Sequence, residues 1–240
     1  MSHNRVVLLF LTAFLLLAFQ TNDQTNTADP STYLADIKKE LTKEWPGNRT
    51  INLVFHGHSV PAGYFKTPVV NTFDSYPYLL LKELKELYPH AVINVICTAI
   101  GGENSSEGAK RFESDVLVHK PDVLFIDYAL NDRGIGLEQS KEAWDEMISK
   151  ALKEGIRVIL LTPSPDQRVD MLEPDNELEQ HAEQIKHLAE YYGTGLVDSY
   201  EVFKYRVQNG DHLSDYMSQV NHPNKKGHQL IADELIRFFK

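Results

Sequence analysis

Val54-Phe55-His56-Gly57-His58-Ser59-Val60-Pro61 is the stretch on which the interpretation of the whole sequence depends. The hydrophobic run that leads into it, residues 51–55, is short and rich in β-branched and aromatic side chains, which predicts a buried strand. Gly57 ends the run, and Ser59 follows where such a strand would pass into a loop. Because ligands bind at the carboxyl ends of strands in open α/β sheets, Ser59 is a candidate nucleophile. The alternative is an ordinary loop serine that caps a helix or closes a turn.

The rest of the sequence repeats the order strand, loop, helix. Strand-like runs occupy 51–56, 91–97, 123–128, 156–161 and 195–197, and helix-like patterns occupy 31–44, 76–87, 137–154, 176–192 and 225–240. Apolar strands that alternate with helices predict a parallel sheet that is covered on both faces. We therefore expect a single α/β domain over residues 31–240, without internal repeats.

The composition is that of a globular protein, with 42% hydrophobic and 24% charged residues in a chain of 240. The formal net charge is −10 and the lysines and arginines are scattered, so a nucleic-acid partner is not expected. Cys97 is the only cysteine, which excludes an internal disulfide. It lies in a strand-like run and is expected to pack as a small apolar side chain.

The N-terminus has the order of a secretory leader. Arg5 precedes an apolar run from Val6 to Phe19, and a polar segment follows. We expect residues 1–20 to be a signal peptide, residues 21–30 to be a polar tether, and the mature protein to be secreted or periplasmic. The apolar run is shorter than the about 20 residues that a membrane span needs, so no stable membrane insertion is expected after removal of the leader.

Four short segments carry the side chains that acyl transfer requires. Three of them follow the first three strand-like runs and the fourth lies near the C-terminus: Gly57-His58-Ser59, Gly101-Gly102-Glu103-Asn104, Ala129-Leu130-Asn131-Asp132 and Asn221-His222-Pro223-Asn224. Ester cleavage by a serine needs a hydroxyl nucleophile, an imidazole base and preorganised N–H donors for the developing oxyanion. A serine, a glycine turn, an asparagine and a late histidine in this order satisfy that need.

These segments resemble the four sequence blocks of the SGNH (GDSL-type) hydrolase family, and the similarity covers nearly all of residues 51–240. It includes the runs KPDVLFIDYALND, LLTPSPD and NHPNKKGHQLIADEL. The resemblance implies that Ser59 is the nucleophile and His222 the base, and that Gly102, Asn131 and the backbone N–H of Ser59 form the oxyanion hole. It also implies a flavodoxin-like three-layer α/β/α sandwich with a central parallel sheet of about five strands, and ester hydrolysis without a metal or another cofactor.

Three positions depart from the family pattern. His58 stands where the family has an aspartate after the first glycine, and Ala129 replaces the first glycine of the third block. Gln219 occupies the position, three residues before His222, where the family has another aspartate. Such a carboxylate orients the base and stabilises the imidazolium. The side-chain oxygen of Gln219, the carboxylate of Asp215 and a backbone carbonyl are the candidates for this role.

Further candidates lie near the same blocks. Asn104, Tyr64 and Phe65 are on predicted loops and could line an acyl or sugar pocket, with surface packing as the alternative. His56 and His58 form an H-x-H pair of the kind that can ligate a metal, but no cysteine or carboxylate cluster accompanies it in the sequence. We expect no metal there, and a hydrogen-bonding role for His58 in the turn.

The sequence therefore predicts a secreted serine esterase that hydrolyses small acyl groups. The resemblance and the predicted export together favour O-acetyl groups on a carbohydrate as the substrate. A lysophospholipase or lipase is the alternative enzyme, although no long exposed apolar segment of the mature chain indicates binding to a lipid surface. Gln219 and Ala129 suggest a third interpretation, a catalytically impaired relative that binds carbohydrate.

Overall fold

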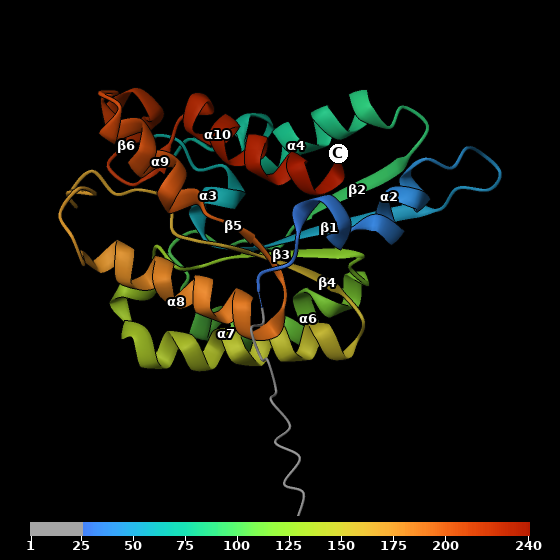
Figure 1. The fold of residues 1–240 in the computed structure, drawn as a ribbon, viewed down its shortest axis with the longest axis horizontal. Coiled ribbons are helices and arrows are strands. Elements are labelled where there is room, and N and C mark those ends of the chain that lie inside the picture. The colour runs from blue at the N-terminus through green and yellow to red at the C-terminus, as the bar shows by residue number, and fades with distance from the viewer. Residues whose placement is uncertain (1–25) are drawn as a thin grey trace, which may run out of the picture.

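A five-stranded parallel sheet forms the centre of the protein (Figure 1). The computed structural model describes residues 26–240, so the predicted leader and the first half of the predicted tether lie outside the described residues. In chain order the strands are β1 (Thr50–Gly57), β2 (Val92–Cys97), β3 (Val123–Asp127), β4 (Arg157–Leu161) and β5 (Gly195–Val197). Their order across the sheet is β2-β1-β3-β4-β5. This order is that of flavodoxin-like folds, so the predicted fold class is confirmed.

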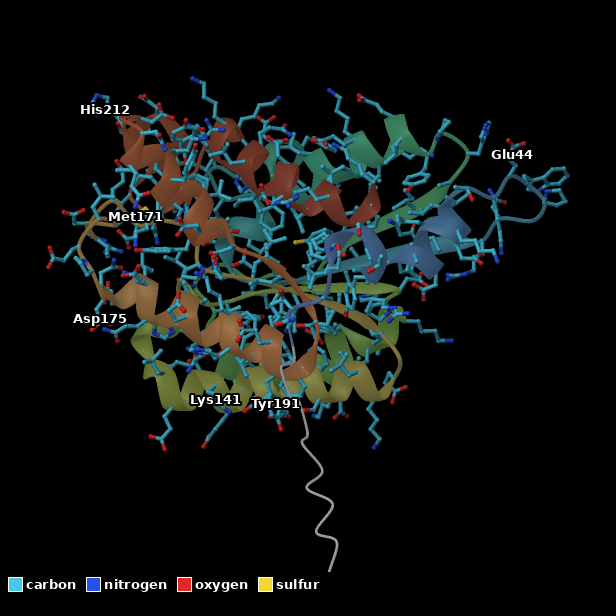
Figure 2. All side chains as sticks on the ribbon, viewed as in Figure 1. Glu44, Lys141, Met171, Asp175, Tyr191 and His212 are labelled. Carbon is cyan, nitrogen blue, oxygen red and sulfur yellow. The ribbon has the colours of Figure 1, made fainter. Side chains whose placement is uncertain are left out.

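Helices cover both faces of the sheet and make it the middle of three layers (Figure 1). One layer contains α1 (Pro30–Tyr33), α2 (Ala35–Leu41), α4 (Tyr76–Leu87), α9 (Ser199–Gln208) and α10 (Lys225–Leu235). The other contains α5 (Ser105–Lys110), α6 (Phe112–Asp115), α7 (Gly136–Lys153) and α8 (Glu177–Tyr192). Charged side chains project outward from both helical layers (Figure 2). Within residues 26–240, no helix combines the length and the apolar character that crossing a membrane would require.

Alternate residues of the strands pack into two separate hydrophobic cores. Phe55 of β1 and Phe125 of β3 lie in the core on the side of α4 and α10, and their rings stack with centroids 4.2 Å apart. Val54 and Ile126 lie in the second core, with the fully buried Trp144 of α7. Successive side chains of a strand point to opposite faces, so a strand that is covered on both faces is a continuous apolar run in the sequence.

The chain changes direction at the centre of the sheet. After β1 it crosses to β2 on one side of β1, and it then returns to β3 on the other side. The carboxyl ends of β1 and β3 therefore form a topological switch point, where open α/β sheets bind their ligands. The candidate nucleophile Ser59 lies at this point, because it begins α3 (Ser59–Ala62) directly after β1.

Two helices differ from their predicted limits. The helix expected over 31–44 is two short helices on either side of Leu34, whose backbone leaves the helical region (φ −102°, ψ 27°). The helix expected over 225–240 continues beyond α10 as a 3-10 turn, Ile236–Phe239. Tertiary packing of the apolar side chains, rather than helical continuity, decides where these segments end.

Helix α9 and a short hairpin are among the elements that were not expected from the sequence. Helix α9 has few buried side chains, so its apolar positions form no continuous stripe. A short antiparallel hairpin of β6 (Met217–Gln219) and β7 (His222–Pro223) lies outside the main sheet and carries the candidate base His222. The strands of the hairpin, Met-Ser-Gln and His-Pro, contain no apolar run of the kind that indicated the equally short β5.

Phe125→Ala is expected to lower the free energy of unfolding by about 3–5 kcal/mol, because it removes a fully buried ring and its stacking contact with Phe55. Urea denaturation followed by circular dichroism measures this change. Phe73, which is 82% exposed, provides the control. Phe73→Ala is expected to change the free energy of unfolding by less than about 0.5 kcal/mol. Similar effects of the two substitutions would contradict the place of Phe125 in the core.

Candidate active site

A glycine lets the nucleophile loop approach the neighbouring strand. A side chain at Gly57 would place its Cβ 2.3 Å from the backbone oxygen of Asp127, so only glycine fits at this point between β1 and β3. The backbone N–H of His58 donates to the same oxygen at 3.2 Å. Ser59 then begins α3 and is buried. The loop thus turns away from the sheet within two residues of the strand's end.

The imidazole of His58 caps the helix that Ser59 begins. Its Nδ1 accepts the backbone N–H of Val60 at 3.2 Å, so the ring proton is on Nε2. Nε2 lies 3.4 Å from Oδ1 of the buried Asp127, whose Oδ2 accepts the hydroxyl of Tyr76 at 3.0 Å. Burial and the nearby carboxylate raise the pKa of Tyr76 well above its ordinary value, so Tyr76 stays a donor. His58 Nε2 and Asp127 Oδ1 thus face each other in the interior, but they form no hydrogen bond.

His222 lies within hydrogen-bonding distance of Ser59. Its Nε2 is 2.9 Å from Oγ of Ser59, and the histidine is buried. Burial lowers the pKa of His222, although its hydrogen bond to the Phe65 backbone oxygen opposes this shift. The imidazole is therefore neutral at neutral pH, as a general base must be. A hydroxyl and an imidazole in this arrangement can transfer a proton from Oγ to Nε2.

Two groups compete for the other ring nitrogen of His222. The backbone oxygen of Phe65 lies 3.1 Å from Nδ1, and the amide nitrogen of Gln219 lies 2.8 Å from it. Thr67 fixes the orientation of that amide, because its backbone N–H can only donate and it donates to Oε1 of Gln219 at 3.0 Å. Phe65 favours the tautomer with a proton on Nδ1, which leaves Nε2 free to accept the proton of Ser59. Gln219 favours the other tautomer, in which Nε2 donates to Ser59.

The backbone oxygen of Phe65 is thus the acceptor that can orient the base. The side-chain oxygen of Gln219, one of the three candidates from the sequence, does not take this role, because it accepts from Thr67 and the amide nitrogen faces the ring. Among residues 26–240 the hydrogen-bond partners of Nδ1 are Phe65 and Gln219, so the carboxylate of Asp215 is not one of them. Asp215 lies in an exposed turn before β6.

Contacts from distant parts of the chain hold the hairpin that carries His222. Gln167, in the loop after β4, donates its backbone N–H to the oxygen of Val220 at 2.8 Å. Its side-chain amide donates to the backbone oxygen of Gln219 at 3.1 Å. The side chain of Gln219 in turn forms hydrogen bonds with Thr67, in the 63–71 loop that follows α3. No local sequence pattern signals these contacts, and sequence reasoning missed them.

The other candidate oxyanion donors lie on the loops after β2 and β3. Gly102 is exposed and has a left-handed backbone (φ +84°), which favours glycine. Asn131 lies in the turn after β3, and its Nδ2 donates to the backbone oxygen of Glu103 at 2.9 Å. This bond joins the two loops. It uses one N–H of the amide and leaves the second for an oxyanion.

Tyr64 lies between the candidate base and the Gly102 loop. Its ring centroid is 5.8 Å from that of His222, and a Cβ on Gly101 would be 2.8 Å from its Cζ. Asn104 instead caps α5, where its Oδ1 accepts a backbone N–H of the first turn at 3.1 Å. Of the three predicted substrate-binding residues, the structure thus brings Tyr64 and the main chain of Phe65 to His222, and it engages the Asn104 side chain in a helix cap.

Besides His58, three histidines are buried outside the Ser59–His222 pair: His56, His181 and His228, whose Nδ1 accepts the backbone N–H of Tyr76 at 3.3 Å. His56 has Nδ1 2.9 Å from Oγ1 of Thr98 and Nε2 3.2 Å from the hydroxyl of Tyr128. His181, which the polar face of its helix would place in solvent, is also buried, and burial lowers its pKa to about 4. Among residues 26–240, no group of three or more His, Cys, Asp or Glu side chains is arranged to hold a metal ion.

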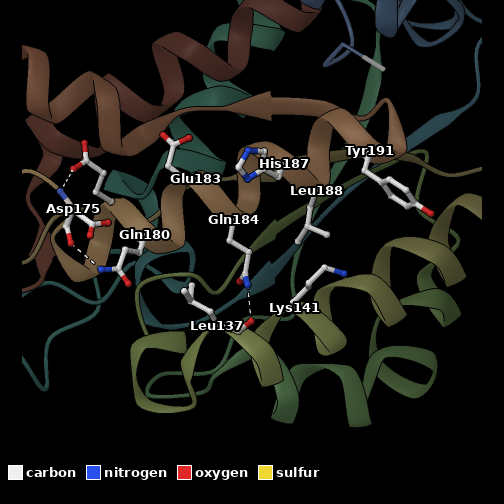
Figure 3. Close-up of a pocket in the computed structure, with 10 residues that line it drawn as sticks. Leu137, Lys141, Asp175, Gln180, Glu183, Gln184, His187, Leu188 and Tyr191 are labelled. Carbon is white, nitrogen blue, oxygen red and sulfur yellow. Dashed lines mark hydrogen bonds between the residues drawn. The ribbon is translucent and has the colours of Figure 1, made fainter. Parts of the chain in front are cut away.

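A groove of about 1220 Å³ lies elsewhere, between α7 and α8 (Figure 3). Leu137 and Lys141 line it from α7, and Glu183, His187 and Tyr191 are among the residues that line it from α8. In Figure 2, Lys141 and Tyr191 lie on the helical layer that contains α7 and α8. The lining includes none of the candidate catalytic or oxyanion residues, so the groove is separate from the candidate active site.

Comparison with known families identifies the class of the protein. Residues 55–230 match the GDSL-like lipase/acylhydrolase family. The match covers most of the chain, which therefore belongs to this family.

Two relatives are similar in sequence. The uncharacterized lipoprotein YqeF of Bacillus subtilis (strain 168) is 35% identical over 81 residues, which are 30% of this chain and 33% of the relative. An acetylxylan esterase of Geobacillus stearothermophilus is 24% identical over 168 residues, which are 64% of this chain and 75% of the relative. The chain thus matches about a third of the length of the first relative and three quarters of the second.

Solved structures share the fold. Axe2, an acetylxylan esterase from Geobacillus stearothermophilus, superposes with a TM-score of 0.69 at 21% identity, over 79% of this chain and 94% of Axe2. A two-domain esterase, CEX, active on acetylated mannans, superposes with a TM-score of 0.70 at 22% identity, over 90% of this chain and 54% of that protein. At these identities the superpositions establish a common fold.

Gln219→Glu is expected to raise kcat/KM for an activated acetate ester by about tenfold or more. The substitution is isosteric and places a carboxylate oxygen beside Nδ1, which selects the tautomer whose Nε2 accepts from Ser59. The negative charge also favours the imidazolium, so the pKa of His222 rises and the acidic limb of the pH profile moves up by about one unit. Steady-state kinetics across the acidic and neutral range measure both effects.

Asp215→Asn is the companion variant, because Asp215 is the other carboxylate considered for this role. Its side chain is not a partner of Nδ1, so kcat/KM is expected to stay at the wild-type value. A loss of activity in Asp215→Asn, or an unchanged profile in Gln219→Glu, would contradict the assignment of the Phe65 oxygen as the acceptor.

Proposed function

We propose that the protein is a serine esterase that removes small acyl groups, above all O-acetyl groups, from carbohydrate. The observation that carries the proposal is the 2.9 Å contact between Oγ of Ser59 and Nε2 of His222 at the carboxyl end of β1. The backbone oxygen of Phe65 can hold the proton of Nδ1, and Asn131 has an N–H to offer an oxyanion. These parts are the ones acyl transfer needs, and they disfavour a catalytically impaired carbohydrate-binding relative.

In the proposed reaction, Nε2 of His222 accepts the hydroxyl proton as Oγ of Ser59 attacks the ester carbonyl carbon. The oxyanion of the tetrahedral intermediate accepts hydrogen bonds from the backbone N–H groups of Ser59 and Gly102 and from Nδ2 of Asn131. The imidazolium then protonates the departing alcohol oxygen of the sugar, which leaves an acyl group on Oγ. A water molecule that His222 deprotonates releases the acid and regenerates the serine.

The backbone oxygen of Phe65 has a defined part in this cycle. While His222 carries both ring protons, Nδ1–H donates to this oxygen, and a neutral carbonyl stabilises the imidazolium less than a carboxylate would. The lowered pKa of His222 agrees with this arrangement, because burial is the main cause and no carboxylate within residues 26–240 offsets it. We infer a dyad that a main-chain carbonyl supports.

Similarity to characterised proteins supports acetylated carbohydrate as the substrate class. Axe2 is an acetylxylan esterase, and CEX is active on acetylated mannans. Catalytic mutants of Axe2 replace a serine and a histidine by alanine. The charged, apolar and polar order of residues 1–20 supports a secreted or periplasmic protein, and a polymeric substrate would be met outside the cytoplasm.

A lipid acylhydrolase is the second candidate. Val69, Val70 and Val220 are each at least 43% exposed, on the 63–71 loop and the hairpin that flank His222. Exposed apolar side chains that gather near a site favour contact with an apolar ligand. A higher kcat/KM for acetate than for octanoate esters, together with acetate release from acetylated xylan or mannan, would favour the carbohydrate esterase. The reverse preference would favour the lipid enzyme.

Hydrolysis of p-nitrophenyl acetate by the wild type and by active-site variants tests the proposal. Ser59→Ala and His222→Ala are each expected to lower kcat by about 10³-fold or more, and Asn131→Ala by about 10²-fold or more because it removes one oxyanion donor. His187→Ala removes an exposed histidine of α8 and is expected to leave kcat unchanged. Wild-type activity no higher than that of Ser59→Ala would refute the proposed esterase function.

The rate is expected to rise with pH through the pKa of His222 in the free enzyme. Below this pKa the imidazole is protonated and cannot accept the proton of Ser59. Since burial lowers the pKa, the midpoint of the acidic limb of kcat/KM is expected below 6.5, the ordinary value for histidine. A midpoint above that value would indicate a carboxylate partner in place of the Phe65 oxygen.

A further inference from the structure

A buried carboxylate lies next to the candidate oxyanion glycine. Glu103 directly follows Gly102, and its side chain is turned into the protein. Arg111, at the end of α5, binds it with two N–H groups, Nε to Oε1 at 2.7 Å and Nη2 to Oε2 at 2.5 Å. The hydroxyl of Tyr128, the residue after β3, donates to Oε2 at 2.7 Å. Three donors from two parts of the chain thus hold one carboxylate.

The same network reaches the ends of β1 and β2. The hydroxyl of Tyr128 lies 3.2 Å from Nε2 of His56 in β1, and Nδ1 of His56 lies 2.9 Å from Oγ1 of Thr98, just after β2. Nε2 also lies 3.2 Å from the backbone oxygen of Gly108, which can only accept, so Nε2 carries the ring proton. Burial lowers the pKa of His56 to about 4, and the ring is neutral. A chain of hydrogen bonds therefore links Glu103 through Tyr128 to polar groups at the ends of β1 and β2.

The network keeps Glu103 ionised. Burial alone would raise the pKa of Glu103, but the hydrogen bonds from Arg111 and Tyr128 outweigh it and hold the pKa below its ordinary value. Arg111 also bonds to Asp115 through Nη1 at 3.3 Å. A bidentate pair of guanidinium and carboxylate has a defined geometry, so it fixes the direction of the side chain as well as its charge.

The main chain of Glu103 connects this network to an oxyanion donor. Its carbonyl accepts Nδ2 of Asn131 at 2.9 Å. A carbonyl oxygen repels the side-chain oxygen of an asparagine, so this contact determines which end of the amide faces Glu103. Asp132 adds a second link between the two loops, because its Oδ1 accepts the backbone N–H of Ser105 at 2.8 Å. The side chain of Glu103 is thus held in the interior while its main chain holds Asn131.

We propose that Glu103 is a positioning residue for the oxyanion hole: with Arg111 and Tyr128, it holds its own carbonyl where the amide of Asn131 directs its free N–H toward the reacting ester. Glu103 does not touch the substrate in this role and acts through Asn131. The inference rests on the proposed esterase function. It follows from the requirement that oxyanion donors be in place before the charge develops.

Glu103→Ala is expected to lower kcat for p-nitrophenyl acetate by about 10- to 100-fold with little change in KM, because the misplaced donor matters mainly in the transition state. Glu103→Gln keeps one oxygen for Arg111 and is expected to retain more activity, and it replaces Glu103→Ala if that variant does not fold. Glu113→Gln neutralises an exposed carboxylate of α6 and is the matched control, with kcat expected to be unchanged. An unchanged kcat in Glu103→Ala would overturn the proposal.

A double-mutant cycle separates positioning from a general loss of structure. If Glu103 acts through Asn131, Glu103→Ala changes kcat by less than about twofold in the Asn131→Ala background. The same large factor in both backgrounds would show that Glu103 acts by another route and would overturn the proposal.

The Asn131 amide can also be followed without turnover. Its Nδ2 protons are assigned in NMR spectra by their disappearance in Asn131→Ala, and the proton bonded to the Glu103 carbonyl is expected to exchange with solvent at least about tenfold faster in Glu103→Ala. Unchanged exchange would overturn the role of Glu103. A wild type that hydrolyses no ester would refute the proposed function instead, so the two failures are distinguishable.

Discussion

The close approach of β1 to β3 at Gly57 is the constraint on which the rest of the site depends. Without a side chain there, the main chain after Gly57 reaches the backbone oxygen of Asp127 and leaves the sheet at once. Ser59 consequently begins a helix at the switch point of the sheet. The side chain of Asp127 meanwhile faces His58 and accepts from Tyr76. A single residue of β3 thus meets the nucleophile loop through its main chain and faces the cap of α3 with its side chain.

The two sides of the site are held in different ways. On the oxyanion side, the loops are held by the Glu103–Arg111 ion pair, which is largely shielded from solvent, and by the side chains of Tyr128 and His56. On the base side, the hairpin of His222 is held by uncharged amide and main-chain contacts to Gln167 and to the 63–71 loop, whose residues 66–70 are exposed. Segments with many exposed backbone bonds open more readily than buried ones. The 63–71 loop and the hairpin next to His222 are therefore expected to open more readily than the loops on the oxyanion side.

Much of this arrangement could be predicted from the sequence because its signals are local. The run before Gly57 indicated a strand, and the order of Ser59, Gly102, Asn131 and His222 indicated one edge of a parallel sheet. The acceptor for Nδ1 could not be predicted, because every residue has a backbone oxygen and nothing in the sequence distinguishes that of Phe65. The orientation of Gln219 likewise depends on Thr67, which is far away in the chain.

The use of a main-chain oxygen beside the base has a consequence for how this chain can vary. Every residue type has a backbone oxygen, so a substitution of Phe65 does not remove this acceptor. An insertion or deletion that changes the path of the 63–71 loop does remove it. The backbone oxygen also does not titrate, whereas an aspartate is protonated in acid. Mild acid therefore leaves this acceptor unchanged. Related chains would therefore keep this acceptor by keeping the length and shape of the 63–71 loop. A search for a conserved aspartate or glutamate in the sequence would overlook it.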